Sequence, residues 1–255
     1  MLRYEVSSHR ATLTIDDPER RNPLSTTTMS ELREAVERAA SDSSVRVIVI
    51  TGAGDRAFSA GGDLAGDFVE DPVALQAARK ALAELFRAMR SAGKPIIARV
   101  NGHALAGGFG LAAACDIVIA VEEARFGLPE INVGLWPMMI TAVLQRCMPH
   151  KALLDLMMTG RLIDCAAAHR LGVVSRVVAQ GELDRIVDDT VTELAGKSPI
   201  ALRLGRDAFY AVEGMAFDVS LDLLQSGLTA VAMTNDAAEG IAAFLEKRKP
   251  DWTGT

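Results

Sequence analysis

The sequence predicts an α/β domain that is followed by a helical region at its C-terminal end. Three β-branched and almost wholly apolar runs, at residues 45–50, 96–100 and 117–120, have the composition of strands that are covered on both faces. Segments with a helical spacing of apolar residues lie between these runs, and such alternation is typical of parallel βαβ units. After Trp136 the pattern becomes mostly helical. We therefore expect an α/β core and a helical tail.

The elements of the core are expected in the following order. Residues 2–7 and 11–15 read as a β-hairpin that ends at Asp16-Asp17-Pro18. Thr28-Met29-Ser30-Glu31 fits a capping box, which predicts Thr28 as the N-cap of the first helix. The three buried runs named above follow as strands. The remaining elements of this half are a loop at 64–72, a long helix at about 73–89 and a glycine-opened helix at about 107–114.

The rest of the chain is expected to be helical, apart from one short strand at 173–178. No low-complexity linker and no repeat of solenoid length divides it. The predicted helices cover residues 138–148, 151–158, 166–171, 183–195, 199–212, 218–233 and 236–246.

The composition excludes several classes of protein. With 255 residues and a net charge of −6, the chain can bury a substantial core and lacks the basic stripe of a nucleic-acid-binding protein. Its three cysteines have no metal-binding spacing, and an odd number suits reduced thiols in a cytosol. The sequence has neither the apolar run of a signal peptide nor the roughly 18 apolar residues of a membrane span. We expect a cytoplasmic protein that binds neither nucleic acid nor metal.

Three glycines, Gly107, Gly108 and Gly110, stand at or near the start of a predicted helix. Glycine costs about 1 kcal/mol relative to alanine inside a helix, so the cluster needs an explanation. One explanation is close packing of the helix on the preceding strand. Another is a cradle that lets an anionic ligand approach the first free N–H groups of the helix. A dinucleotide-binding fingerprint is a weaker third explanation, because the spacing does not match GxGxxG.

A second glycine cluster, Gly61-Gly62-Asp63, follows a strand and a turn in a similar way. It does not fit the GxSxG pattern of a serine nucleophile, because the residues around Ser59 are Ala57-Phe58 and Ala60-Gly61, with Ala57 in place of the first glycine. Downstream, Glu130 lies in an apolar stretch, where burial would raise the pKa of its carboxyl group and favour proton exchange near neutral pH. The alternative for Glu130 is an ordinary exposed loop acid. Together, one carboxylate and two glycine turns could move a proton next to a carbonyl group.

The order and spacing of these segments resemble the enoyl-CoA hydratase/isomerase (crotonase) family over nearly the whole chain. The segments that carry the resemblance are Asp17-Pro18, Arg21-Asn22-Pro23-Leu24, AFSAGGDL at 57–64, KPIIA at 94–98, Asn101 to Gly108, Cys115-Asp116, FGLPE at 126–130, Gly134-Leu135 and EGIAAFLEKRKP at 239–250. The resemblance implies an α/β crotonase (ClpP-like) fold, which is a spiral of ββα units with a C-terminal helical trimerisation region. On this basis we expect a spiral core in residues 1–195 and a helical region in residues 196–255.

The resemblance also implies partners. The expected ligand is an acyl-CoA thioester, and coenzyme A is then part of the substrate, so no cofactor is expected. The expected assembly is a homotrimer, or a hexamer that is a dimer of trimers.

The family register implies roles for individual residues. The amides of Gly62 and Gly107 would form an oxyanion hole, and Glu130 would be the catalytic acid/base. Trp136 either lines the acyl pocket or belongs to the core or a trimer contact. The residues that would contact the substrate or its CoA are Arg21, Pro23, Leu24, Ala57, Ala60, Asp63, Leu64, Gly108, Pro129 and Trp136, together with Phe244 and Lys247, whose family counterparts sometimes reach across a subunit boundary.

The sequence departs from the two-glutamate pattern of the family at Gly110, where such hydratases have a second glutamate. A water molecule held by one carboxylate is less well oriented, and poor orientation slows its addition. Asp63, Asp67 and Glu70 are candidates for a second acid. Enoyl-CoA hydratase of fatty-acid or related acyl-CoA metabolism is the best label. The alternatives are an enoyl-CoA isomerase, another single-glutamate lyase, or a CoA-thioester-binding homologue without turnover.

Overall fold

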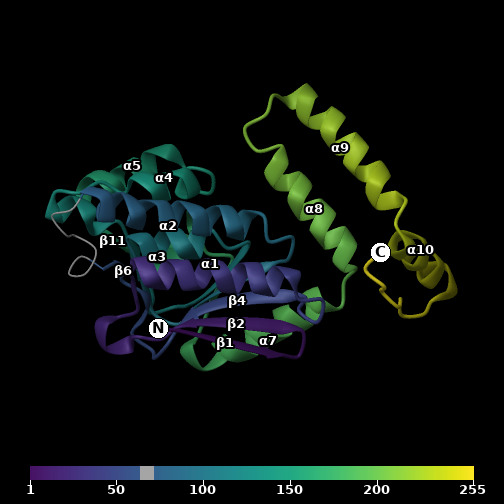
Figure 1. Cartoon of the computed structure of the whole chain (residues 1–255), viewed down its shortest axis with the longest axis horizontal. Helices are drawn as coiled ribbons and strands as arrows, with labels where there is room; N and C mark the ends of the chain where they lie inside the picture. The colour runs from purple at the N-terminus through teal and green to yellow at the C-terminus, as the bar shows by residue number, and fades with distance from the viewer. Residues whose placement is uncertain (64–71) are drawn as a thin grey trace.

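The computed structural model describes residues 1–63 and 72–255. A six-stranded sheet forms the centre of the core (Figure 1), with the order β1-β2-β4-β7-β9-β12. The hairpin β1–β2 is antiparallel, and every other neighbouring pair in this sheet is parallel. The strands are β1 (Leu2–Ser7), β2 (Arg10–Ile15), β4 (Val47–Gly52), β7 (Ile96–Val100), β9 (Ile117–Val121) and β12 (Arg176–Val178).

A second sheet of four short strands lies beside the first, with the order β11-β10-β8-β5. Its strands β5, β8 and β10 are parallel, and β11 pairs antiparallel with β10. The strands are β5 (Ala57–Ser59), β8 (His103–Leu105), β10 (Arg125–Gly127) and β11 (Leu162–Asp164), and a further two-stranded pair consists of β3 (Pro23–Leu24) and β6 (Gly61–Gly62). These six strands of two or three residues are absent from the sequence prediction.

The two sheets are joined by a repeated ββα unit. In each unit a strand of the first sheet continues into a strand of the second sheet and then into a helix. The units are β4-β5-α2, β7-β8-α3 and β9-β10-α4, in which the helices are α2 (Pro72–Arg90), α3 (Gly107–Ala113) and α4 (Met138–Leu144). Successive units stack strand against strand, so the chain forms the predicted spiral.

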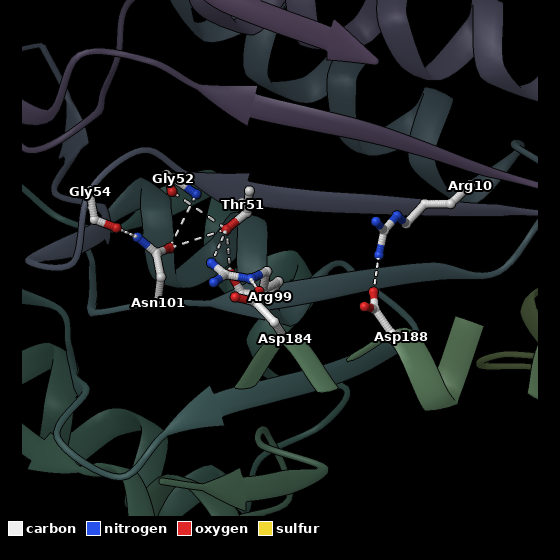
Figure 2. A network of polar contacts seen from close by, with 8 residues as sticks. All are labelled: Arg10, Thr51, Gly52, Gly54, Arg99, Asn101, Asp184 and Asp188. Atoms are coloured by element: carbon white, nitrogen blue, oxygen red, sulfur yellow. Dashed lines mark hydrogen bonds and ion pairs between the residues drawn. The ribbon is translucent and has the colours of Figure 1, made fainter. Parts of the chain in front are cut away.

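The remaining helices of the core pack around the two sheets. They are α1 (Thr26–Ser41), α5 (His150–Thr159), α6 (Cys165–Arg170) and α7 (Leu183–Ala195), together with three 3₁₀ turns, η1 (Pro18–Arg20), η2 (Pro129–Val133) and η3 (Gln180–Glu182). Figure 1 shows α1 and α7 on opposite sides of the strands β1, β2 and β4. Two ion pairs hold α7 to the sheet, namely Arg99–Asp184 at 2.7 Å and Arg10–Asp188 (Figure 2).

Four predicted elements have a boundary that is wrong by two residues or more. The strand expected at 45–50 covers Val47–Gly52, and the helix expected at 138–148 ends at Leu144, after which the chain continues in turns.

The N-cap of α1 is Ser25, not Thr28, because the Ser25 hydroxyl accepts a hydrogen bond from the Thr28 backbone N–H at 3.1 Å. The earlier start buries Thr28 and Met29 on the first turns of the helix. The strand expected at 173–178 is shorter, since only its last three residues pair with β9. Val173 and Val174 are buried without joining the ladder.

A buried polar network fixes the connection between β4 and β5. The Asn101 side-chain oxygen accepts from the Gly52 backbone N–H at 3.2 Å, and its NH₂ group donates to the Gly54 carbonyl at 2.7 Å (Figure 2). Asn22 completes the network, because its NH₂ group donates to the carbonyls of Ala53 and Ala57 at 3.0 and 2.7 Å. Both asparagine side chains therefore replace backbone pairing where the chain crosses from one sheet to the other.

The helices α8 (Pro199–Ala211), α9 (Phe217–Ala232) and α10 (Asn235–Glu246) extend away from the core (Figure 1). One anchor is Arg206 on α8, whose guanidinium donates to both Asp116 oxygens at about 3 Å (2.9 and 3.0 Å) and to the Met89 carbonyl. No residue of α9 is buried. The domain boundary expected after residue 195 stays a prediction. Among the described helices, none combines the length and the apolar character that crossing a membrane requires.

Candidate active site

The candidate residues Gly62, Gly107 and Glu130 follow the carboxyl ends of three adjacent parallel strands. Gly107 comes two residues after β8, the central strand, and Glu130 comes three residues after its neighbour β10. On the other side of β8, β5 leads through Ala60 into Gly62. Because the strands are parallel, their carboxyl ends meet at one edge of the four-stranded sheet. The topology therefore brings together the two glycine turns and the carboxylate.

The two glycine turns approach each other closely. A Cβ atom on Gly61, whose φ is +92°, would lie 2.6 Å from the Ala106 Cβ and 2.9 Å from the Gly107 nitrogen. A Cβ atom on Gly107 would lie 3.7 Å from the Gly62 nitrogen. Gly62 itself is exposed, and no atom lies within 4 Å of the position that its Cβ would occupy. The two backbone segments therefore come together with open space beside Gly62.

Gly107 is the first residue of α3, and its backbone N–H has no acceptor within the helix. The N-cap residue Ala106 provides no side-chain hydrogen bond, and its backbone is unusual, with φ of 49° and ψ of −126°. The Ala106 N–H donates to the Gly127 carbonyl at 2.9 Å, which ties this turn to β10. A ligand oxygen beside Gly62 and Gly107 could accept hydrogen bonds from both amides.

Glu130 lies in the first turn of η2 and is half-buried. Its Oε2 atom is inaccessible to solvent and has no hydrogen-bond partner among the described residues. Burial raises the pKa of the Glu130 carboxyl group above its usual value, and a hydrogen bond from its own backbone N–H opposes this rise. The loop after it is closed by the hydrogen bond from the Leu135 N–H to the Glu130 carbonyl at 2.9 Å. The structure thus holds a carboxyl group that has one buried oxygen without a partner among the described residues and a pKa that is shifted toward neutral pH.

The position of Gly110 is filled from outside the helix. A Cβ atom on Gly110 would lie 2.2 Å from Ile140 Cγ2 and 3.5 Å from Phe86 Cζ. Gly110 and Ile140 are both buried. The side of α3 where a second glutamate is absent therefore faces an apolar wall from α2 and α4.

The segment 20–24 lies against the Gly62 turn. The strands β3 and β6 pair Pro23 with Gly61 and Leu24 with Gly62, and the Ala60 N–H donates to the Arg21 carbonyl at 2.9 Å. Ala57 is buried at the start of β5. The residues that the resemblance assigns to CoA binding in this part of the chain are therefore gathered beside the glycine turns: Arg21, Pro23, Leu24, Ala57 and Ala60.

Asp63 extends this arrangement. Both of its carboxylate oxygens accept hydrogen bonds from Arg20 at 2.7 Å, and the Asp63 side chain is only 9% exposed. This ion pair attaches the residue after Gly62 to η1. The other candidates in the same stretch, Leu64, Asp67 and Glu70, lie outside the described residues.

The remaining predicted contacts fall into two groups. Gly108, Pro129 and Trp136 lie close to the site in sequence; a Cβ atom on Gly108 would be 2.4 Å from the Ser59 carbonyl oxygen, so this glycine is required for packing. Trp136 is partly buried and packs against the core. Phe244 lies in the last turn of α10 and Lys247 is its C-cap residue, and Figure 1 shows α10 on the opposite side of the molecule from β6. Within one chain the structure does not bring them to the site.

Four residues near the site have no role in the sequence prediction, namely Arg20, Phe86, Asn101 and Ile140. Asn101 occurs in a motif that carries the family resemblance, so its importance was signalled but its contacts were not. The contacts of Phe86 and Ile140 with Gly110 join residues 24 and 30 positions apart, and no sequence pattern indicates them.

Comparison with known proteins points in one direction. Residues 5–255 match the family model described as enoyl-CoA hydratase/isomerase. The chain is 36% identical over 253 residues to the crotonyl-CoA hydratase of Syntrophomonas wolfei, with 97% of this chain and 96% of that protein covered. It is 35% identical over 246 residues to the carnitinyl-CoA dehydratase of Proteus mirabilis, with 93% of each covered. The crystal structure of an enoyl-CoA hydratase from Mycobacterium smegmatis superposes with a TM-score of 0.95 at 32% identity and covers 98% of both chains.

Proposed function

The chain belongs to the enoyl-CoA hydratase/isomerase family and has the crotonase fold, as its sequence predicts, and we propose that it moves a proton on the acyl group of an acyl-CoA thioester. The observation that carries this proposal is the half-buried Glu130 carboxylate, whose Oε2 atom has no partner among the described residues, at the strand edge where the Gly62 and Gly107 turns meet. A carboxylate with a raised pKa is suited to taking and returning a proton near neutral pH.

In this mechanism the thioester oxygen accepts hydrogen bonds from the Gly62 and Gly107 amides. These bonds strengthen as negative charge develops on the oxygen during enolate formation, so they stabilise the transition state more than the bound substrate. The Glu130 carboxylate takes a proton from a carbon of the acyl group or returns one to it. The enolate is stabilised by backbone amides alone, so we propose that the reaction needs no cofactor besides the CoA that belongs to the substrate.

Hydration of an enoyl-CoA, or the reverse dehydration, is the first candidate reaction. The water oxygen bonds to the carbon β to the thioester, one proton goes to the α carbon, and the double bond is lost. The names of the relatives from Syntrophomonas wolfei and Proteus mirabilis, a hydratase and a dehydratase, support this reaction class.

Isomerisation of the acyl double bond is the second candidate, and Gly110 favours it. Glu130 would remove a proton from one carbon and return it to another, while the double bond moves between them. This reaction needs one carboxylate and consumes no water. The apolar contacts of Gly110 with Ile140 and Phe86 are compatible with it, because neither side chain offers a polar group that could hold a water molecule.

In this proposal, neighbouring subunits contribute residues to the CoA site. We propose a homotrimer or a dimer of trimers in the cytoplasm, in which α9 and α10 pack against neighbouring subunits. The support is that α9 has no buried residue within this chain, and its large apolar side chains are exposed: Phe217 is 75% and Leu228 is 70% exposed. A neighbouring subunit would cover them. Phe244 is 82% exposed at the end of α10, and together with Lys247 it would reach the CoA of a neighbouring subunit. The mass of the purified protein by light scattering tests this assembly.

The test of the proposed function is Glu130→Gln against a panel of enoyl-CoA thioesters. The substitution keeps the shape of the side chain and removes its ability to accept a proton, so turnover should fall by about 10²–10⁴-fold. Glu123→Gln is the matched control, because Glu123 is an exposed acid seven positions earlier in the chain. Product analysis distinguishes hydration from isomerisation. Equal turnover of Glu130→Gln and wild type would overturn the catalytic role, and a wild type that processes no member of the panel would indicate a binding protein.

A further inference from the structure

The contact between Gly110 on α3 and Ile140 on α4 excludes any side chain at position 110. A Cβ atom on Gly110 would be 2.2 Å from Ile140 Cγ2 and 2.7 Å from Ile140 Cβ. Both distances are shorter than 3.0 Å, and Cβ atoms in real structures essentially never come that close to another heavy atom. The glycine at position 110 is therefore required by Ile140.

Ile140 cannot relieve this overlap by rotating its side chain. Its Cβ is attached directly to the α4 backbone, so a change of rotamer moves Cγ2 but leaves the 2.7 Å contact in place. Ile140 is 3% exposed and Gly110 lies in the buried face of α3. Phe86 of α2 closes the space from a third side, with Cζ at 3.5 Å. Only movement of α4 relative to α3, or a smaller residue at position 140, would make room.

We propose that Ile140 is a residue that determines reaction selectivity, because it keeps a second acid out of the site. The inference rests on the proposed function, in which Glu130 acts from the neighbouring strand end. With position 110 closed, one carboxylate carries out proton transfer between carbons, and water that would add to the double bond is poorly held. The α3–α4 contact then sets the ratio of isomerisation to hydration.

The steric part of the proposal is tested by stability, without any substrate. In a helix, glycine to alanine normally stabilises by about 1 kcal/mol. Gly110→Ala in the wild type should instead lower the Tm by several degrees, because the added methyl group overpacks the contact with Ile140. In an Ile140→Gly background the same change should raise the Tm. Ile140→Ala is the matched intermediate, since it retains the Cβ at 2.7 Å and should restore tolerance only in part.

The selectivity part is tested with Gly110→Glu combined with Ile140→Gly, and Gly110→Gln combined with Ile140→Gly is the matched control. One enoyl-CoA is given to both proteins, and the hydrated and the isomerised products are measured. The ratio of hydration to isomerisation should be at least about tenfold higher with glutamate than with glutamine, since a second carboxylate orients the water. Gly110→Asp with Ile140→Gly provides a shorter carboxylate if the glutamate variant does not fold.

The outcomes separate this inference from the function on which it rests. A Gly110→Ala change that raises the Tm in the wild type would overturn the steric claim. An unchanged product ratio in enzymes with Glu130-dependent turnover would overturn the selectivity role alone. Absence of Glu130-dependent turnover in the wild type would overturn the proposed function, and the selectivity role with it.

Discussion

The two sheets of the core differ in how they are held together and in what they carry. The central strands β2, β4, β7 and β9 of the six-stranded sheet contain five or six residues each, are largely buried and carry no candidate site residue. The four-stranded sheet has only three residues in each strand, yet the ends of β5, β8 and β10 lead into the candidate site. Short ladders provide few backbone hydrogen bonds, so side chains and glycine contacts must hold the second sheet. The site is therefore more sensitive than the scaffold to single substitutions in these contacts.

Among substitutions that test this difference between the sheets, Gly108→Ala is expected to lower the free energy of unfolding most. The new methyl group would lie 2.4 Å from the Ser59 carbonyl oxygen, which is backbone of β5 and cannot rotate away. Overpacking of this kind costs about 1–3 kcal/mol, and we expect the upper end of that range. The free energy of unfolding from urea denaturation measures the loss. Gly62→Ala is the control, because no atom lies within 4 Å of its missing Cβ, and it should leave stability nearly unchanged.

The next effect separates the two sheets directly. Asn101→Ala removes hydrogen bonds to the Gly52 and Gly54 backbone and should cost about 2 kcal/mol, because buried polar groups lose their partners (Figure 2). Val49→Ala in β4 should cost a similar amount through lost apolar burial. Only Asn101→Ala should also lower kcat, since Asn101 holds the connection that leads to Gly62. Equal kcat in the two variants would show that the connection does not position the site.

A smaller effect concerns pH and the Glu130 carboxyl group. Burial raises its pKa in the folded state above the unfolded value, so the protonated form is favoured by folding. The stability contributed by this group is therefore fully present below the unfolded pKa and is lost as the pH rises through the folded pKa. Glu130→Gln should become the more stable protein above that pH. Thermal melts of both proteins across a pH series measure the crossing; parallel curves would contradict it.

The smallest effect is expected from Arg20→Ala. Arg20 is half exposed, and its ion pair with Asp63 is partly screened by solvent. Removing it should lower the Tm slightly at low salt, and the difference should vanish at about 1 M salt, where charges are screened within a few ångströms. A Tm difference that persists at high salt would assign Arg20 a packing role instead.

The contrast between the sheets also explains what the sequence could predict. The strand at 96–100 and the helix at 183–195 agree with the structure to the residue, because long buried runs and long amphipathic patterns carry their own signal. Strands of three residues, such as β8 and β10, are too short to show a periodicity and form only because neighbouring units stack. The true N-cap, Ser25, lacks the glutamate of a capping box, so the sequence favoured Thr28.

The candidate site was predictable in part, because short motifs in the sequence mark some of its residues. The motifs around Gly62, Gly107 and Glu130 placed these residues in the register of the family, and the roles assigned to them there stay predictions. The apolar contacts of Gly110 could not be predicted. Ile140 meets Gly110 only because α3 packs against α4, and a strand pair and a turn separate these two helices in the sequence.

The most direct test of the central claim is exchange of the α-carbon proton of a bound acyl-CoA in deuterated water. If Glu130 moves that proton while the Gly62 and Gly107 amides hold the enolate, the wild type should incorporate deuterium at the carbon next to the thioester. Glu130→Gln should incorporate about 10²–10⁴-fold more slowly, and Glu123→Gln should match the wild type. Mass spectrometry of the recovered thioester measures the rate. Equal incorporation by wild type and Glu130→Gln would contradict the account.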